Sequence, residues 1–457
     1  MSEPVDVAVI GAGVVGSAIA RELAGYRLRV ALLEARDDVG DGTSKANTAI
    51  LHTGFDATPG TLESRLMARG YQLLGDWAGH TGIPIERTGA LLVAWTEQER
   101  AALPGLHHKA ARNGYPATEL IDSAEVYRRV PHLGAGALAG LTVPGESITC
   151  TWTTTLGLAT DAVQRGVQLL LGHRVERVDS DGELTTLRCG GRLVQARWVV
   201  NAAGLGADVI DGLFGFRRFT VTPRRGELLV FDKQARSLVD TIVLPVPSAL
   251  GKGVLISPTI YGNVMLGPTA EPLPDRHATG TSPAGFEFLL ERGRRLMPRL
   301  LAEEVTASYA GLRAAIDRDD YLIELAPDLR YLLVGGIRST GLTSSMAIAE
   351  HVRQLLAEAG LPMRQRDTLP EPPSMPNLGE AFRRPYQDGG RIAADAEYGR
   401  LVCFCERVTR GEIRDALRST IPPADLAGLR RRTRAMNGRC QGFYCGAQVQ
   451  QLLEQGT

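Results

Sequence analysis

The chain of 457 residues is 44% hydrophobic, enough apolar material for two or three domains with buried cores. Basic and acidic residues number 51 each, so no net charge draws the protein to nucleic acid or to an anionic membrane. The apolar run 7–20 contains three glycines and follows Glu3 and Asp6, unlike a signal peptide. No stretch is long and apolar enough to span a bilayer, so we expect no membrane insertion and a cytoplasmic location.

The N-terminal residues predict a strand, a tight turn, a helix and a second strand. Residues 5–10 form an apolar run typical of a buried strand, 17–25 a helix with small residues, and 29–33 the next strand. The turn between the first strand and the helix carries glycine at positions 11, 13 and 16. This order is typical of a Rossmann-type dinucleotide-binding domain.

The chemistry of that turn suits a dinucleotide. Gly11, Gly13 and Gly16 allow the backbone to approach a pyrophosphate at the positive end of the helix. Glu34, eighteen residues beyond Gly16, is placed to accept hydrogen bonds from a ribose. The glycine motif alone is weak, because the chain holds 52 glycines, but the strand, helix and acid around it make it specific.

Two further glycine-rich turns follow apolar strands, in residues 198–208 and 331–350, and the polar segment 42–48 follows the second strand. Each alone is an ordinary strand-to-helix connection. Three such turns across the whole chain favour an extended cofactor, FAD, over NAD. Strand-like runs at 226–231, 241–246, 253–259 and 263–269, with residues near 83–95, predict an antiparallel substrate-binding sheet.

Together these segments resemble the FAD-dependent oxidoreductase superfamily that includes D-amino acid oxidase and glycerol-3-phosphate dehydrogenase, over about residues 1–360. Within it, TSKANTAILHTGFDATPG at 43–60 and the C-terminal CFCERVTRGEIRDAL and GRCQGFYC are similar to the family of anaerobic glycerol-3-phosphate dehydrogenase large subunits. The resemblance implies an α/β fold with a Rossmann-type FAD-binding domain, an antiparallel-sheet substrate domain and a small C-terminal iron-sulfur module.

The predicted domains interleave along the chain. The FAD-binding domain comprises residues 1–80, 146–210 and 330–361, and the substrate domain comprises 81–145 and 211–329. Residues 362–397, with six prolines between 362 and 385, form an extended linker to the module at 398–457.

The resemblance also implies which residues hold the cofactor. Those expected around FAD are Gly11, Gly13, Gly16, Glu34, Thr43, Ser44, Asn47, Gly204, Gly336, Gly341, Leu342 and Thr343. This chain departs from the family at one point. Many relatives carry a proline before the last glycine of the turn in 331–350, and this chain has Arg338-Ser339-Thr340 there instead.

Substrate oxidation at a flavin requires a group that accepts a proton and groups that orient the substrate. His52 follows the cofactor loop directly and is the leading candidate for the base, although a purely local hydrogen bond is an equal alternative. Arg313 resembles the arginine that binds an anionic substrate in this family, and a guanidinium gives paired donors to carboxylate or phosphate. Weaker candidates, each more easily explained as solvated or structural, are Arg225, Lys252, Tyr261 and Arg338.

Four of the six cysteines lie near the C-terminus, as Cys403-x-Cys405 and Cys440-x4-Cys445. A structural zinc site usually uses wider C-x2-4-C spacing, and the expected compartment disfavours disulfides. The pattern resembles the bacterioferritin-associated ferredoxin type of module, which implies that these four cysteines bind a 2Fe-2S cluster. The other two, Cys150 and Cys189, are expected to be buried thiols.

Charged residues surround these cysteines. Thr409 and Glu412 have the spacing of a capping box and predict a helix start just after Cys405. Six arginines can offset the negative charge of a thiolate-bound cluster, form a docking face, or simply be a solvated helix face: Arg407, Arg430, Arg431, Arg432, Arg434 and Arg439.

The sequence therefore predicts an FAD-dependent dehydrogenase that oxidises a small anionic hydroxy substrate, with His52 accepting the hydroxyl proton and electrons leaving through the 2Fe-2S cluster. By resemblance, glycerol 3-phosphate is the first candidate substrate and a 2-hydroxy acid the next. The expected partner is an electron-accepting protein subunit. Two alternatives are an amine or imino-acid dehydrogenase subunit of the opine or proline type and a non-catalytic electron-transfer or assembly subunit.

Overall fold

The computed structural model describes residues 3–247 and 253–456. It begins with the predicted unit: strand β1 (Val5–Ile10), helix α1 (Val14–Leu23) and strand β2 (Val30–Leu33). All of β2 is buried, as expected of a parallel strand that is covered on both faces. The bounds of β1 are those predicted from the sequence.

Helix α1 begins three residues earlier than predicted. The sequence places its start at Ser17, after the third glycine of the motif, whereas Gly16 lies inside the helix. A Cβ atom at Gly16 would lie 1.8 Å from the carbonyl oxygen of Gly11. The third glycine is therefore needed for close packing of the helix against the turn.

The first large sheet is built around β1 and is mainly parallel. Its central order is β9-β2-β1-β12, with β20 and the hairpin β10–β11 both pairing along the long strand β12, and β19 on the far side of β20. The remaining strands are β9 (Gln168–Leu170), β10 (Arg177–Ser180), β11 (Thr185–Cys189), β12 (Arg192–Asn201), β19 (Leu322–Ala326) and β20 (Tyr331–Gly335).

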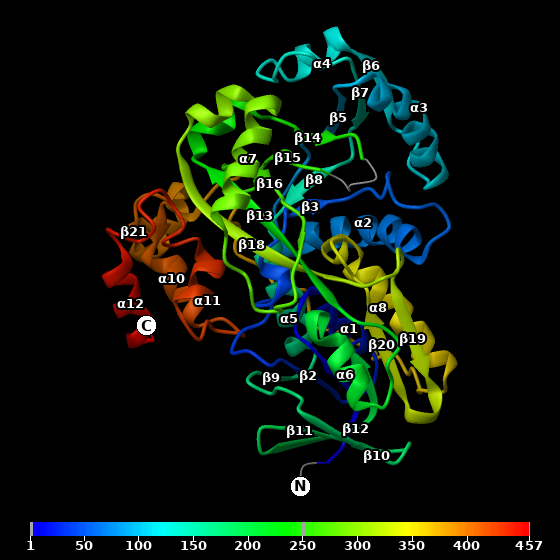
Figure 1. Cartoon of the computed structure of the whole chain (residues 1–457). Coiled ribbons are helices and arrows are strands. Elements are labelled where there is room, and N and C mark those ends of the chain that lie inside the picture. Colours follow the sequence, from blue (N-terminus) through cyan, green and yellow to red (C-terminus); the bar gives the residue numbers. More distant parts are fainter. Residues whose placement is uncertain (1–2, 248–252, 457) are drawn as a thin grey trace.

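Helices cover this sheet and form the largest buried core. Helix α1 contacts α5 (Thr151–Gln164) and α8 (Gly341–Glu358), and α2 (Leu62–Thr81) packs on α8. Helix α6 (Ala207–Leu213) follows β12 and contacts β20. The core therefore lies between the sheet and helices drawn from distant parts of the chain (Figure 1).

The second large sheet has the order β17-β13-β16-β15-β14-β5-β7-β6, with β18 also paired to β13. Its strands are β5 (Ala90–Ala94), β6 (Glu119–Asp122), β7 (Ala139–Val143), β13 (Thr222–Phe231), β14 (Ile242–Pro245), β15 (Leu255–Pro258), β16 (Val264–Gly267), β17 (Glu271–Pro272) and β18 (Val305–Ala315). Its helices are α3 (Glu97–Arg112), α4 (Ser123–Arg129) and α7 (Pro283–Leu296).

One pair in this sheet departs from the predicted antiparallel arrangement. Strand β14 runs parallel to β5, with Val243 opposite Leu91. The two strands lie more than 140 residues apart in the chain, and parallel strands need a long crossover. Here the chain crosses through the first sheet between them. A small third sheet has the order β3-β8-β4. Its strands are β3 (Ile50–Leu51), β4 (Ile85–Glu86) and β8 (Ser147–Thr149), and each comes in the sequence between strands of the two large sheets.

The C-terminal module contains the hairpin β21 (Leu401–Cys403) and β22 (Val408–Thr409), then α10 (Arg410–Leu417), α11 (Leu426–Thr433) and α12 (Gly446–Gln455). The predicted capping box is present at the start of α10, with Thr409 and Glu412 exchanging hydrogen bonds. The module lies to one side of the main body, next to α5 (Figure 1).

The segment before the module is extended and lies against the main body. The Met375 amide donates to the Thr81 carbonyl at 2.8 Å, and the Glu380 amide donates to the Ile260 carbonyl at 2.9 Å. Leu378 is buried in the core of the second sheet. Only the short helix α9 (Gly389–Ala394) and 3-10 turns interrupt the segment. These contacts tie the module to the body.

Candidate active site

A cavity of about 700 Å³ lies at the carboxyl ends of β1, β2, β12 and β20, where ligands bind in open α/β sheets. Strands β13 and β18 of the second sheet close its other side. The predicted site residues that line it are Gly11, Gly13, Glu34, Thr43, Ser44, Asn47, His52, Gly204, Arg313, Gly336, Gly341 and Leu342. The fold thus brings twelve predicted residues from the whole main body to one space.

The turn after β1 is shaped for close approach of a ligand. Gly11 has a φ of 104°, and a Cβ there would lie 2.6 Å from the carbonyl oxygen of Ala202. Glu34 at the end of β2 accepts hydrogen bonds from the amides of Ala12 (2.9 Å) and Arg36 (3.0 Å). Burial raises the pKa of Glu34, and these two bonds partly offset that effect. The turn and the acid fit the adenosine half of a dinucleotide.

The polar loop that follows β2 is held in place by its own side chains. Ser44 Oγ accepts from the Val14 amide at 2.9 Å, and Thr43 Oγ1 donates to the Leu312 carbonyl at 2.9 Å. The Asn47 amide donates to Thr151 Oγ1 at 2.9 Å. These bonds connect the loop to α1, β18 and α5, so the loop has a fixed shape beside the cavity. We name residues 43–48 the cofactor loop.

Two predicted cofactor residues do not line the cavity. Gly16 is packed inside the glycine turn, as described above. Thr343 is fully buried, and its Oγ1 accepts the backbone amide of His52 at 3.0 Å. Thr343 therefore supports the histidine rather than facing the cavity.

His52 lies in a network that the sequence did not reveal. Its Nδ1 is 2.9 Å from Oε2 of Glu146, whose side chain has no exposed surface. The other oxygen, Oε1, accepts from the amide and the hydroxyl of Thr53, at 2.7 and 2.9 Å. Glu146 is 94 residues away in the chain, in a turn before β8 without a motif of its own. The carboxylate fixes the ring of His52 and leaves Nε2 for another partner.

Arg313 reaches the same cavity from β18. It is partly buried, and Nη1 makes a long contact of 3.5 Å with the Thr269 carbonyl. It forms no ion pair with a carboxylate among the residues that the structure describes. Burial, and then the charge of Arg224, lower the pKa of Arg313 to about 10, so it stays charged at neutral pH.

Of the other arginines that line the cavity, three are already paired with carboxylates and Arg174 is exposed. Arg36 pairs with Asp41 at 2.9 Å, Arg276 with Asp208 at 2.6 Å, and Arg338 with Glu63 at 2.7 Å. Each pair holds a loop or turn at the cavity wall. Arg313 therefore stands out among the partly buried arginines as a cation available to a ligand.

The weaker candidates have other contacts. Arg225 pairs with Glu271 at 2.5 Å and lies beside Glu227, so its role is structural. Tyr261 is buried below the C-terminal module, and its hydroxyl lies 3.1 Å from Cys150 Sγ. Lys252 lies outside the described residues.

The departure at 338–340 has a structural counterpart in α2. Glu63 accepts from Arg338 Nη2 at 2.7 Å and from Thr340 Oγ1 at 2.8 Å. Tyr321 donates or accepts at Thr340 Oγ1 at 2.6 Å. Hydrogen bonds to Glu63 thus fix the turn where many relatives carry a proline.

The four C-terminal thiols face one another as two pairs. Cys405 interacts with Cys440, and Cys403 with Cys445, and all four are free thiols. Backbone amides of residues 442–444, Tyr444 first, lower the pKa of Cys440, whereas burial raises the pKa of Cys445 to about 12. Among the described residues, no three histidine, cysteine, aspartate or glutamate side chains are grouped so that they could hold a single metal ion. Two thiol pairs fit a 2Fe-2S cluster, in which each iron takes two protein sulfurs.

The six arginines near the cysteines are largely committed to contacts. Arg431 and Arg432 bind Asp38 of the main body at 2.6 and 2.8 Å, and Arg439 binds Asp232 at 2.9 Å. Arg434 pairs with Glu406, Arg407 with Glu380, and Arg430 donates to Asn437. They are neither a free solvated face nor a free docking face, because several of them dock the module onto its own body.

Comparison with known proteins agrees with this geometry. The family described as FAD dependent oxidoreductase matches residues 6–355, and the BFD-like 2Fe-2S binding domain matches residues 401–455. The chain therefore belongs to the FAD-dependent oxidoreductase family and carries a 2Fe-2S domain at its C-terminal end. Together with the relatives described next, these matches confirm the predicted fold class, both cofactors and an FAD-dependent dehydrogenase.

Individual relatives extend over most of the chain. The chain is 35% identical to a glycerol 3-phosphate dehydrogenase of Caloramator mitchellensis, over 98% of this chain and 93% of that protein. It is 28% identical to a mitochondrial L-2-hydroxyglutarate dehydrogenase of Caenorhabditis elegans, over 76% of this chain and 92% of that protein. The structure of dithionite-reduced L-alpha-glycerophosphate oxidase from Mycoplasma pneumoniae with FAD bound matches with a TM-score of 0.77 at 27% identity, covering 82% of this chain and 100% of that chain.

No described helix has both the length and the apolar character that a membrane crossing requires.

The two remaining cysteines, Cys150 and Cys189, are buried thiols as predicted, and burial raises the pKa of Cys189 to about 11.

Proposed function

We propose that this protein is a dehydrogenase of glycerol 3-phosphate or a closely similar small anionic hydroxy compound. The observation that carries the proposal is Arg313, a charged guanidinium without a carboxylate partner among the described residues, in the cavity that His52 also lines. A phosphate or carboxylate of the substrate supplies the missing anion. The names of the relatives support glycerol 3-phosphate as the first candidate and a 2-hydroxy acid as the second.

The residues divide the chemistry among them. Arg313 binds the anionic end of the substrate and so orients the hydroxyl-bearing carbon. His52, held by Glu146 through Nδ1, accepts the hydroxyl proton at Nε2. In the cavity, FAD would supply the acceptor for the hydride that leaves the same carbon. The products are a carbonyl compound, a protonated histidine and a reduced cofactor, so atoms and charges balance.

We assign the cofactor contacts to the cavity residues and the cluster ligands to the four cysteines. Gly11, Gly13 and Glu34 suit the adenosine and pyrophosphate part of FAD. The cofactor loop, with the turn at Gly336 and the start of α8, suits the part nearer the flavin. Cys403, Cys405, Cys440 and Cys445 suit the cluster, and the reducing cytoplasm keeps such thiolates available for iron.

An electron-accepting protein completes the proposed reaction. The cysteine loops carry three strongly exposed aromatic side chains, Phe404 at 70%, Phe443 at 85% and Tyr444 at 80%. Exposed aromatic side chains at this density are typical of protein contacts. They flank the cluster ligands, where a partner would receive electrons over the shortest path.

The test is anaerobic addition of candidate substrates to the purified holoenzyme, followed by flavin absorbance. Glycerol 3-phosphate should bleach the flavin, whereas uncharged glycerol should not, because it lacks an anion for Arg313. L-2-Hydroxyglutarate and L-proline distinguish the hydroxy-acid and imino-acid alternatives. In His52→Asn, bleaching by the active substrate should slow by about 10²-fold to 10⁴-fold, the usual range for loss of a general base.

Three outcomes would contradict the proposed function. Bleaching by glycerol as fast as by glycerol 3-phosphate would remove the anion requirement. Bleaching by L-proline alone would favour the imino-acid reaction. If no small molecule bleached the flavin while a partner protein reduced it, the chain would be an electron-transfer subunit.

A further inference from the structure

An aromatic stack connects the cofactor loop with the cysteine module. Its first member, Trp152, is the second residue of α5 and donates its indole N–H to the carbonyl of Lys45 at 2.9 Å. The residue before it, Thr151, donates to the Ser44 carbonyl at 2.9 Å. The start of α5 is thus fixed to the loop that lines the cofactor cavity.

The second member is Tyr261, which follows β15. Its ring stacks on Trp152 with centroids 5.0 Å apart and an interplanar angle of 24°. Tyr261 is buried, and burial raises its pKa well above the usual range, so its ring stays neutral. The two rings form a continuous contact from the cofactor loop to the face on which the module lies.

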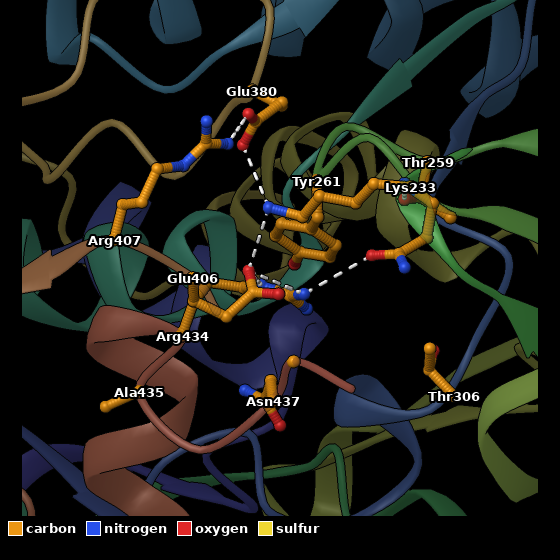
Figure 2. Close-up of polar contacts among 12 residues, drawn as sticks. Lys233, Thr259, Tyr261, Thr306, Glu380, Glu406, Arg407, Arg434, Ala435 and Asn437 are labelled. Atoms are coloured by element: carbon orange, nitrogen blue, oxygen red, sulfur yellow. Dashed lines mark hydrogen bonds and ion pairs between the residues drawn. The ribbon is translucent and has the colours of Figure 1, made fainter. Parts of the chain in front are cut away.

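The module contributes the third member. The Arg434 guanidinium lies 4.2 Å from the centre of the Tyr261 ring and 5.8 Å from that of Trp152. This is the geometry of a cation–π contact, strengthened where water is excluded. Figure 2 shows Arg434 and Glu406 next to each other, below Tyr261 in this view.

The last link reaches the cysteines. Arg434 donates from Nε and Nη2 to one oxygen of Glu406, at 3.1 and 3.0 Å. Glu406 is buried and directly follows Cys405 in the chain. Lys233 also binds Glu406, at 3.2 Å, so the contact is fixed from the main body as well (Figure 2).

The backbone at Arg434 indicates that its position is specified. Arg434 ends α11 with a φ of 71°, a left-handed conformation that is uncommon for residues other than glycine. Such conformations persist when surrounding contacts determine them, and they cluster at functional positions. Here the contacts are the Tyr261 ring, the Glu406 carboxylate and the side-chain oxygen of Asn263.

We propose that the Trp152–Tyr261 stack, closed by Arg434, is the route by which electrons pass from the flavin site to the cysteine module. The inference rests on the proposed function for the source of the electrons. Each hydroxyl oxidation brings two electrons to the flavin site, whereas the cluster holds one electron at a time. An external one-electron oxidant removes the first electron from the cluster before the second electron follows. Transfer depends on short, close-packed contacts, which these side chains supply.

The experiment measures transfer directly in the holoenzyme. The flavin is reduced by a light pulse with 5-deazaflavin, and the reduced cluster is followed by freeze-quench electron paramagnetic resonance. Tyr261→Leu and Trp152→Leu should slow cluster reduction severalfold. Tyr261→Phe keeps the ring and should transfer at nearly the rate of the unchanged protein. Full reduction by dithionite checks that each variant contains both cofactors.

A docking control separates electron transfer from module position. Arg431→Gln loosens the same interface at Asp38 without touching the stack. Protease protection of residues 362–385 reports docking in every variant. The proposal is overturned if Tyr261→Leu and Trp152→Leu transfer as fast as the unchanged protein. It is also overturned if Arg431→Gln slows electron transfer as much as the two leucine variants do at an equal loss of protease protection. A third contrary result is that Tyr261→Phe slows electron transfer as much as Tyr261→Leu.

Light reduction also keeps this test independent of the substrate. If no hydroxy compound bleaches the flavin, the proposed function fails, yet cluster reduction after the light pulse still reports on the stack. If the substrate bleaches the flavin normally and the leucine variants transfer at full rate, only the electron route fails.

Discussion

Two arginines, one in the cavity and one in the C-terminal module, meet opposite electrostatic environments. Arg432 is buried and binds both oxygens of Asp38, at 2.8 and 2.9 Å, and two backbone carbonyls. Arg313 is partly buried and has one long contact to a carbonyl. A guanidinium that holds two parts of one chain together brings its anion with it. A guanidinium that binds a ligand has no protein carboxylate beside it. Burying such an unpaired charge lowers the free energy of unfolding of the protein.

Arg432→Met is expected to have the largest effect on stability. The change leaves Asp38 buried with Arg431 as its remaining partner, and breaking a buried pair typically costs about 3–5 kcal/mol. Denaturant unfolding should show an early loss of the module. Asp38→Asn combined with Arg432→Met should lose less than Arg432→Met alone, because the unpaired charge is then absent. Equal losses would show that packing, and not charge, holds the interface.

Arg313→Met should behave in the opposite way. It removes a cation that has no carboxylate partner in the described chain, so the free energy of unfolding should stay constant or rise. Affinity for the anionic substrate should fall by about a hundredfold, or ~3 kcal/mol, in flavin-bleaching titrations. Arg313→Lys should recover part of the affinity, because a point charge lacks the paired donors. A large loss of stability with unchanged affinity would make Arg313 a structural residue.

The contrast also explains which parts of the site could be predicted from sequence. The glycine turn and Glu34 are local signals, since one strand, one turn and one acid lie within thirty residues. The capping box at Thr409 and the cysteine spacing are local as well. For these features the structure has the predicted elements, apart from the earlier start of α1.

Long-range partners had no such signal. Glu146 meets His52 across 94 residues, and Glu63 meets Arg338 across 275. A glutamate in a loop reads as an ordinary surface residue until the fold places it opposite a partner. The parallel pairing of β5 with β14 was missed for the same reason, because pairing direction depends on how distant segments return to the sheet.

The charge contrast should also appear as a dependence of module docking on pH, which is the smallest effect. Burial raises the pKa of Asp38, but hydrogen bonds and charge from Arg432 and Arg431 outweigh it and hold the pKa below the usual range. A lowered folded-state pKa gives stability that is present above the unfolded value, about 3.9, and is lost as the pH falls through the folded value. Protease protection of the segment 362–385 should therefore stay constant from neutral pH to about pH 4 and decline below it.

Asp38→Asn should reduce that acid decline, because the amide does not titrate in this range. The residual slope belongs to Asp41 and Asp232, which also bind module arginines and whose pKa values are also lowered. Asp179→Asn is the matched control, since that carboxylate also has a lowered pKa but lies in β10 of the first sheet and pairs with Arg177 and Arg188 rather than with module arginines. An acid profile that Asp38→Asn leaves unchanged would show that the buried pair at Arg432 does not govern docking. In that case the contrast between the paired Arg432 and the unpaired Arg313 would no longer support Arg313 as a ligand-binding residue.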